Sequence, residues 1–540
     1  MSSSTSSPDA AVIIRRRYGI RRFWRVPTAS AIAWICMVTL AAVRAGSSEE
    51  RDPYWEARAG IENLRGLPLA RPDTWSWAGV GGDWYQNSPG WNDLLGIAWL
   101  FGGFWGLFLI GFATIFALFA LSYLVALRLG AHPLGALAGV VASFIWALPM
   151  LSARATMAVQ VLLVIGLSVP WVWRRKVSRH SALVNAVGLF IIGALLAAFG
   201  NWIHLSFIAV APALAVSWAV YWLFSDWPGD VRSRLHDSKR WALVVGGTVG
   251  LALGTLATPY GVAMTIERSR VTQATCADTV LEWVSPFSSM ALGNWPTVVQ
   301  WPSAAAFALL SSGLFIRWWL RRAWSGRLDE TFARASAVAV VALPLTIAGM
   351  FMLRFLGASF LTFTPVVGMG ITLVSRRLKG YADRLSDDSR FKETAVRWTQ
   401  ARPWRIVLSI VWILLLAPAL LLGPVHHGVP IELAAVEALP HGCRLFTSAS
   451  ISGPTLLLRP DVTVWIDGRA DYFGRQRAID VGIYYSGRGD APTPSGATCV
   501  ILPSIDMNDV TYREAQRLSA DPTWHLLGTF DHLAVWTRTS

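Results

Sequence analysis

Long apolar runs separated by short polar segments fill the first 425 residues of the chain. Most of these runs approach the roughly 17–25 residues that a helix needs to cross the hydrocarbon core of a bilayer. The pattern predicts a mainly α, polytopic helical membrane domain of about eleven spans. The expected spans are 28–43, 103–127, 134–151, 156–173, 183–199, 203–224, 241–258, 303–320, 335–353, 355–374 and 405–422.

The pattern changes near residue 423, where short β-branched runs begin to alternate with turns. Such alternation predicts a small α/β domain. Cys443 and Cys499 lie at two of its expected strands, and outside the cytoplasm they could form a disulfide or remain two buried thiols. Strands are expected at 444–446, 455–458, 462–466, 499–502 and 533–536, and a helix near 509–519.

Composition and charge support a membrane protein and fix its expected orientation. Apolar residues make up 54% of the chain and charged residues 15%, below the roughly 25% of soluble domains. With the N-terminus inside, cytoplasmic segments hold 29 of the 47 Lys and Arg residues, so the net charge of +14 reflects the positive-inside bias and not a nucleic-acid partner. The expected parts are a cytoplasmic basic N-terminus (1–27), a membrane domain (28–422) with outer loops 44–102 and 259–302, and an extracytoplasmic domain (423–540).

The first outer loop combines acids with aromatic residues. A glycosyl transfer needs a carboxylate that takes a proton from the acceptor hydroxyl, and Asp52, Glu56 and Asp73 are the candidates. Asp52 precedes Pro53, so it could instead cap a helix. For Glu56, Asp73 and Asp83 we favour the alternative, which is a solvated loop charge.

Two isolated arginines, Arg154 and Arg354, stand in tight outer turns where the charge bias disfavours them. A guanidinium can donate two parallel hydrogen bonds to phosphate, so both are candidates for binding a lipid phosphate. The alternatives are contact with lipid headgroups or pairing with a loop carboxylate. Arg58 is a third, looser candidate.

Other outer segments carry further candidate substrate contacts. His204 could hydrogen-bond a substrate or serve as an interfacial structural residue, and Tyr260 could line the same cavity with Glu282–Trp283. In the tail, Asp467, Arg469 and Asp471 could bind a glycan or pair with one another, and we favour the pairing.

Cofactor motifs give no positive signal. The sequence contains no P-loop, Rossmann glycine fingerprint, HExxH motif or nucleophile elbow. Its four cysteines lack metal-ligand spacing, so no metal ligands are predicted. A divalent cation would suit the acidic loop, although nothing in the sequence requires one.

The motifs together resemble those of bacterial GT-C-type membrane proteins related to polyprenyl-phosphate-sugar-dependent glycosyltransferases. The resemblance runs from about residue 50 to the end, with departures at Glu56, where members of the group often carry His, and at 91–94. The matching positions are Asp52, Trp55, Gly60, Gly66, Pro68, Asp73, Ser76 and Trp84, followed by 152–154, 258–261, 282–286, 353–355 and 465–472.

This resemblance implies a multi-pass glycosyltransferase of the bacterial plasma membrane, a hexosyl- or pentosyltransferase. It would use a polyprenyl-phosphate-linked sugar among membrane lipids and an envelope glycan, lipid or protein as acceptor. By analogy Asp52 would be the base. The alternatives are a transporter or flippase for a lipid-linked precursor, and a non-catalytic scaffold with the same fold.

Overall fold

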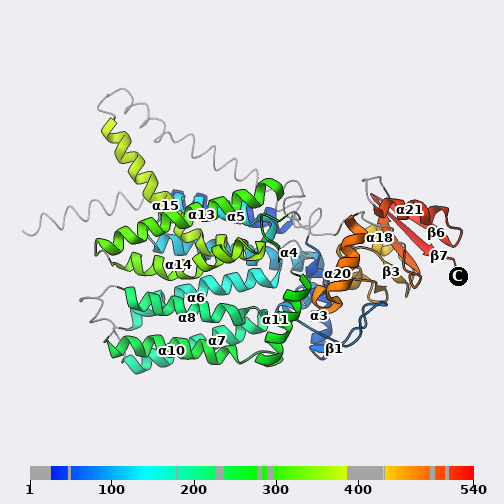
Figure 1. Ribbon diagram of the computed structural model, residues 1–540, viewed down its shortest axis with the longest axis horizontal. Helices are drawn as coiled ribbons and strands as arrows, with labels where there is room; N and C mark the ends of the chain where they lie inside the picture. The colour runs from blue at the N-terminus through cyan, green and yellow to red at the C-terminus, as the bar shows by residue number, and fades with distance from the viewer. Residues whose placement is uncertain are drawn as a thin grey trace, which may run out of the picture.

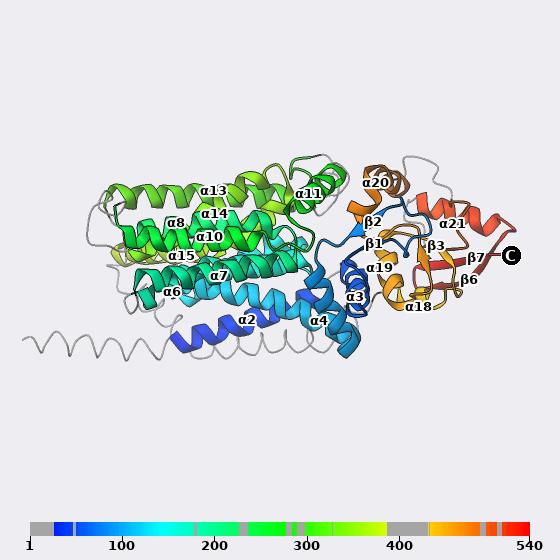
Figure 2. The same cartoon turned by 90° about the horizontal axis from the view of Figure 1, so that it is seen from below.

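The protein forms a long helical bundle joined at one end to a smaller α/β unit (Figures 1 and 2). The computed structural model describes residues 26–46, 50–177, 181–225, 236–276, 283–288, 297–326, 328–385, 430, 432–486, 493–504 and 510–539. Between the bundle and the α/β unit lies the first outer loop, which contains α3 (Asp52–Leu64), β1 (Ala70–Pro72) and β2 (Asp83–Tyr85).

The bundle confirms the membrane class. In the described part of the chain, eight helices are long and apolar enough to cross a membrane, and each coincides with an expected span. Two further expected spans are also helices: 134–151 is the shorter helix α5, and 241–258 is α10, whose first turn carries the charged residues Lys239 and Arg240. The remaining expected span, 405–422, lies outside the described residues. The bundle helices are α2 (Val26–Gly46), α4 (Pro89–Arg128), α5 (Pro133–Ala147), α6 (Ala155–Val177), α7 (Ala182–Ile203), α8 (Phe207–Phe224), α10 (Ser238–Thr255), α13 (Thr297–Trp324), α14 (Glu330–Gly349) and α15 (Leu353–Leu385).

Small residues hold the closest helix pair together. Gly246, Gly250 and Gly254 recur every four residues on α10 and face α7. A Cβ at Gly250 would lie 2.1 Å from the carbonyl oxygen of Phe190, so only glycine permits this approach. In a bilayer no hydrophobic force drives helices together, because lipid tails are as apolar as the helix surfaces. Membrane helices therefore associate through close packing, which small residues permit.

The helix α4 begins earlier than expected and bends. Gly103 has φ 54° inside α4, and this kink coincides with the expected start of the span at residue 103. The segment 89–102 before the kink packs against α3, where a Cβ on Gly60 would overlap the carbonyl of Asn92. The segment also exposes apolar side chains, among them Phe101, which is 90% exposed.

The tail is the expected α/β domain, with a five-stranded sheet of order β4-β3-β5-β7-β6. Strands β4, β3 and β5 run parallel, and β7 and β6 continue the sheet antiparallel. The expected strand at 455–458 is wrong: Ser448 caps a helix there by accepting a hydrogen bond from the amide of Ile451, and the helix buries nearly all of its side chains. The elements are α18 (Leu433–Glu437), β3 (Arg444–Phe446), α19 (Ala449–Leu458), β4 (Thr463–Val464), α20 (Ala470–Ser486), β5 (Cys499–Pro503), α21 (Val510–Ala520), β6 (Trp524–Phe530) and β7 (Leu533–Arg538).

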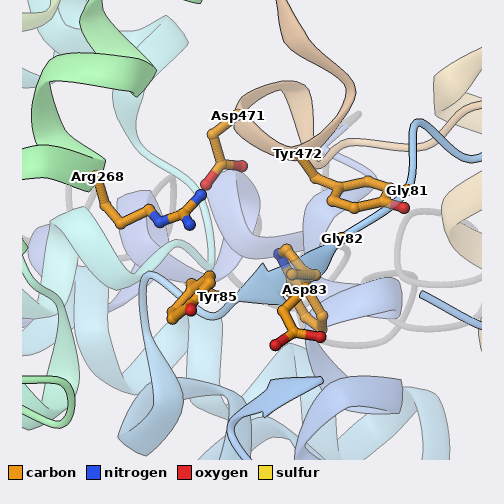
Figure 3. Close-up of a pocket in the computed structure, with 8 residues that line it drawn as sticks. Gly81, Gly82, Asp83, Tyr85, Arg268, Asp471 and Tyr472 are labelled. Carbon is orange, nitrogen blue, oxygen red and sulfur yellow. The ribbon is translucent and has the colours of Figure 1, made fainter. Parts of the chain in front are cut away.

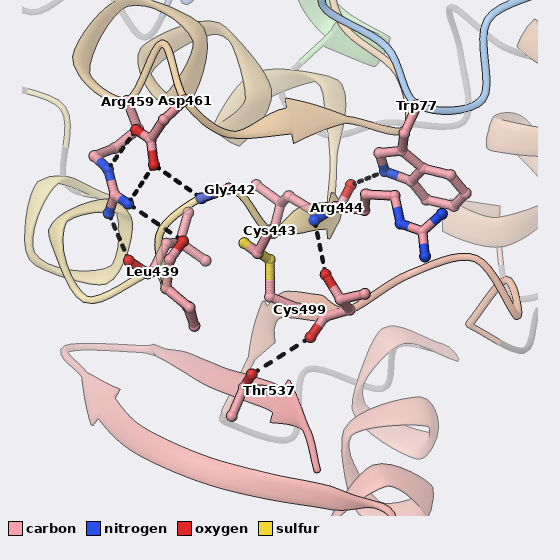
Figure 4. The surroundings of a disulfide bond; sticks show 12 residues. Trp77, Leu439, Gly442, Cys443, Arg444, Arg459, Asp461, Cys499 and Thr537 are labelled. Atoms are coloured by element: carbon pink, nitrogen blue, oxygen red, sulfur yellow. Dashed lines mark hydrogen bonds and ion pairs between the residues drawn. A yellow bond between two sulfur atoms is a disulfide. The ribbon is translucent and has the colours of Figure 1, made fainter. Parts of the chain in front are cut away.

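A disulfide joins Cys443 to Cys499, with their Cα atoms 6.0 Å apart (Figure 4). It links the start of β3 to the neighbouring strand β5 and so decides between the two states that the sequence left open. Beside it, the indole of Trp77 from the first outer loop donates a hydrogen bond of 2.9 Å to the carbonyl of Leu445. The loop is therefore bound to the tail sheet.

Candidate functional site

The site begins at the first turn of α3, where Asp52 is the first helical residue. Arg51 occupies the cap position, and no side chain caps the helix. The alternative that Asp52 serves as a helix cap is therefore wrong, because its side chain does not cap α3. Its Oδ1 instead accepts a hydrogen bond of 2.9 Å from the indole Nε1 of Trp55, one turn further along.

Arg154, in the turn before α6, connects the bundle to the carboxylate of Asp52 through an ion pair. Its Nε lies 2.6 Å from Oε2 of Glu50, and its Nη2 lies 3.4 Å from Oδ2 of Asp52. One guanidinium thus pairs with two acids, which compensates its charge at this end of the bundle. This pairing with loop carboxylates is the alternative that the sequence left open for Arg154, and its role in binding a lipid phosphate stays a prediction.

Burial changes the acidity of two carboxyls in this group. The pKa of Asp52 is raised to about 7, by burial first and by the charge of Glu50 second, against the opposing effects of Arg154 and Trp55. About 30% of the Asp52 side chain is still exposed, so a substrate can reach it. Burial also raises the pKa of Glu56 well above its ordinary value, and its carboxylate accepts a hydrogen bond of 3.2 Å from Trp91.

The tail closes over Asp52 from the other side. Gly468 approaches so closely that a Cβ there would lie 2.5 Å from Oδ1 of Asp52 and 2.4 Å from Nε1 of Trp55. Only glycine lets the backbone of the tail cover this hydrogen bond without displacing it. The site is therefore built from the first loop, the turn before α6 and the tail.

Arg469, the next residue, forms the buried anchor of this contact. Its guanidinium binds both oxygens of Asp467 and lies 2.9 Å from Oδ1 of Asp73. It also lies 4.4 Å and 4.8 Å from the ring centroids of Trp75 and Trp84. The favoured pairing of Asp467 with Arg469 is confirmed. The side chain of Asp73, a predicted catalytic candidate, is buried in this anchor, and its predicted catalytic role stays a prediction.

Arg58 lies in a second ion network of the same loop. Its Nε is 2.6 Å from Oε1 of Glu62, and its Nη1 donates a hydrogen bond of 2.8 Å to the carbonyl of Leu456 in the tail. Glu62 also binds Arg71 at 2.8 Å. These contacts tie α3 to the tail, and the predicted substrate role of Arg58 stays a prediction.

Arg354 and His204 form another group at the same end of the bundle. The guanidinium of Arg354 lies 5.3 Å from the ring centroid of Trp283, and its positive charge disfavours protonation of His204. Burial, with Arg354 second, lowers the pKa of His204 to about 3, so its imidazole is neutral and its Nδ1 accepts the amide hydrogen of Ser206. The structure joins Arg154 to Asp52 but places Arg354 with this other group.

Tyr260 contacts the first outer loop. Its hydroxyl accepts a hydrogen bond of 3.0 Å from the amide of Gln86, and its ring meets that of Tyr85 edge-on at 5.3 Å. It therefore supports β2, and its partner in the predicted cavity, Glu282, lies outside the described residues.

Three participants were not among the predicted site residues: Glu50, Trp55, which entered only as a matching position of the resemblance, and Gly468. Their signals were weak, because an acid two residues before Asp52 and a nearby tryptophan are common in loops. Gly468 stood inside a matched segment, but its contact lies more than 400 residues away in the chain. Among the described residues, no three carboxylate, imidazole or thiol groups gather to hold a metal ion, so we assign no cation here.

Comparison with known proteins yields structural likeness only. No protein-family model and no curated protein matches the sequence. The fold is similar to that of an oligosaccharyltransferase from Archaeoglobus fulgidus tethered with an acceptor peptide, with a TM-score of 0.51 at 10% identity over 87% of this chain and 68% of that one. The oligosaccharyltransferase AglB of the same organism, in complex with an inhibitory peptide and a dolichol-phosphate, matches with a TM-score of 0.51 at 11% identity over 89% and 70%. The fold is therefore GT-C-like.

Proposed function

We propose that the chain is a membrane glycosyltransferase that transfers a sugar from a polyprenyl phosphate to an extracytoplasmic acceptor. The observation that carries the proposal is the surroundings of Asp52: a reachable carboxylate with a pKa raised to about 7, beside an arginine at the end of a membrane bundle. A general base works best when its pKa is near the working pH.

In the proposed reaction, Asp52 takes the proton of an acceptor hydroxyl as that oxygen attacks the anomeric carbon of the donor. The bond from the anomeric carbon to the phosphate oxygen breaks, and the polyprenyl phosphate leaves with the bonding electrons. Arg154 stabilises the growing charge on the phosphate. The raised pKa of Glu56 reduces the negative charge of the site, which lowers its repulsion of phosphate.

A lipid-linked donor is favoured by the surface beside the site. The segment 89–102 carries Trp91, which binds Glu56, on one side, and exposes Leu100 and Phe101 on another. An isoprenoid chain would lie along this apolar surface with its phosphate near Arg154. A dolichol-phosphate accompanies the similar archaeal protein.

The proposed setting is the bacterial plasma membrane, with the tail on the extracytoplasmic side. Basic clusters lie at the bundle end away from the tail, where Arg174 pairs with Glu330 and Arg322 lies 2.6 Å from Asp329. The positive-inside bias places that end in the cytoplasm. The acceptor would then be a cell-envelope glycan or lipid.

The test is transfer by Asp52→Asn in membranes that contain the full chain. Radioactive polyprenyl-phosphate hexoses and pentoses are supplied in turn, and label reaching the acceptor fraction is counted. Loss of the base should slow transfer by about 10²–10⁴-fold. Glu267→Gln, an exposed acid on α11 (Val262–Cys276), is the matched control and should transfer normally. Transfer by Asp52→Asn at the parent rate would refute the catalytic role and favour a scaffold or transporter.

A further inference from the structure

A cavity of about 200 Å³ opens beside the site, between β2, α11 and α20 (Figure 3). It lies on the tail side of the first outer loop. Gly81 and Gly82 have φ values of 80° and 79° at its edge, with open space around both, so that stretch of backbone leaves room for a ligand. The lining residues are Gly81, Gly82, Asp83, Trp84, Tyr85, Arg268, Asp471 and Tyr472.

Arg268 is the cation of this cavity. It comes from α11, and its guanidinium lies 4.0 Å from the ring centroid of Tyr85. Its side chain extends over the cavity toward Asp471 (Figure 3). In the described part of the chain, its buried Nε has no hydrogen-bond partner. A buried donor without an acceptor is costly, so a ligand oxygen would stabilise the site.

The other polar groups decide which ligand fits. Asp471 and Asp83 both line the cavity, so two carboxyls accompany its one guanidinium, which disfavours a phosphate or carboxylate ligand. Asn87 fixes Asp471 through a hydrogen bond of 3.1 Å. Acceptors, donors and aromatic side chains (Trp84, Tyr85 and Tyr472) surround a space below the roughly 300 Å³ of drug-sized sites. Such a lining suits one neutral, hydroxyl-rich ring.

The cavity is also connected to the proposed base. Trp84 forms part of its wall, and the ring of Trp84 meets that of Trp55 edge-on at 6.1 Å. Trp55 in turn donates its indole hydrogen to Asp52. Two aromatic side chains, Trp84 and Trp55, therefore link a ring held in the cavity to the carboxylate that would deprotonate an acceptor.

We infer that this cavity binds a neutral sugar ring of the acceptor, so that the acceptor is a saccharide. The identification of this sugar as the acceptor rests on the proposed function, whereas sugar binding itself can be measured without transfer. Arg268 would bind ring hydroxyl oxygens, and Asp83 and Asp471 would accept hydroxyl hydrogens.

The experiment measures binding to the full chain in nanodiscs by saturation-transfer NMR and titration. The probes are methyl glycosides of neutral hexoses and pentoses, with sodium phosphate as the anionic probe. At least one glycoside should bind, and Arg268→Gln should weaken it by about tenfold, the effect of a lost hydrogen bond to a charged group. Asp83→Asn, at an exposed position, should also weaken it. Arg270→Gln, an exposed change on the same helix, should bind as the parent does.

Asp52→Asn separates this inference from the proposed function, because it should slow transfer by about 10²–10⁴-fold and leave glycoside binding unchanged. The inference is wrong if no neutral glycoside binds, or if both Arg268→Gln and Asp83→Asn bind glycosides as tightly as the parent does. Either result counts even if transfer depends on Asp52. Preference for phosphate would overturn it too. If glycosides bind through Arg268 while no transfer depends on Asp52, the sugar site stands and the transferase function fails.

Discussion

The acids of the first outer loop share one side-chain chemistry but have different surroundings. Asp73 is buried against Arg469, and Glu62 lies between Arg58 and Arg71. Asp52 is reachable and shares one arginine with Glu50. The sequence identified Asp52 by resemblance, but it could not show how its surroundings differ from those of Asp73, because both depend on tail residues about 400 positions away in the chain.

The pH dependence of transfer follows from Asp52. A base must be deprotonated to act, and burial raises its pKa from 3.8 to about 7. The value of kcat/KM should therefore be constant above this pKa and fall by about tenfold per pH unit below it. Arg154→Gln removes a cation that lowers this pKa, so its profile should shift to higher pH. A parent rate that stays constant down to the ordinary range of aspartate would contradict the role of Asp52.

Gly468 is predicted to position the base. In Gly468→Ala the added methyl would overlap Oδ1 of Asp52 and Nε1 of Trp55, which forces the carboxylate aside. We expect kcat to fall by about a hundredfold, the cost of a small displacement at a reacting group, with a smaller change in KM. Gly370→Ala is the control, because a Cβ there meets nothing within 4 Å. Equal kcat values for both variants would show that the contact is not needed.

At the scale of elements, one buried ion cluster joins the tail to the first loop. Arg469 is only 1% exposed and neutralises Asp467 and Asp73 between two tryptophans. Removing one partner of a buried ion pair leaves an uncompensated charge. The turn that carries Gly468 depends on this cluster for its place over Asp52.

Arg469→Met should lower the free energy of unfolding by about 3–5 kcal/mol, because two buried carboxylates lose their cation. The measurement is denaturant unfolding of the full chain in detergent, with hydrogen exchange to locate the loss in the tail and loop 70–85. Arg475→Met, an exposed position on α20, should change stability little. If the two variants unfold alike, the cluster is not the anchor that we describe.

Secondary structure was predictable wherever burial follows the local pattern. Among the described residues, ten expected spans are helices, eight of them long and apolar enough to cross a membrane, and β3, β4, β5, β7 and α21 lie where the pattern placed them. Strand β6 was missed, since most of its residues are exposed and it gains its place by pairing with β7. The helix α19 was mistaken for a strand, because nearly all its side chains are buried and no face stands out.

At the scale of the whole molecule, the charge bias predicted that the motif-bearing segments share one end of the bundle. The contacts agree: the amide of Leu205 donates to the carbonyl of Asn87, and Tyr260 binds Gln86. The sequence could not show which of these segments meet. Arg154 contacts Asp52, whereas Arg354 lies with His204, because packing of helices distant in the chain decides those neighbours.

The central claim is that Asp52 and Arg154 form a lipid-phosphate site at the tail end of the bundle. The most direct measurement is an experimental structure of the full chain in nanodiscs with a polyprenyl monophosphate. We expect the phosphate within hydrogen-bond reach of Arg154 and beside Asp52, with the isoprenoid along Leu100 and Phe101. A phosphate bound at the opposite end of the bundle, or out of reach of Arg154, would contradict the account.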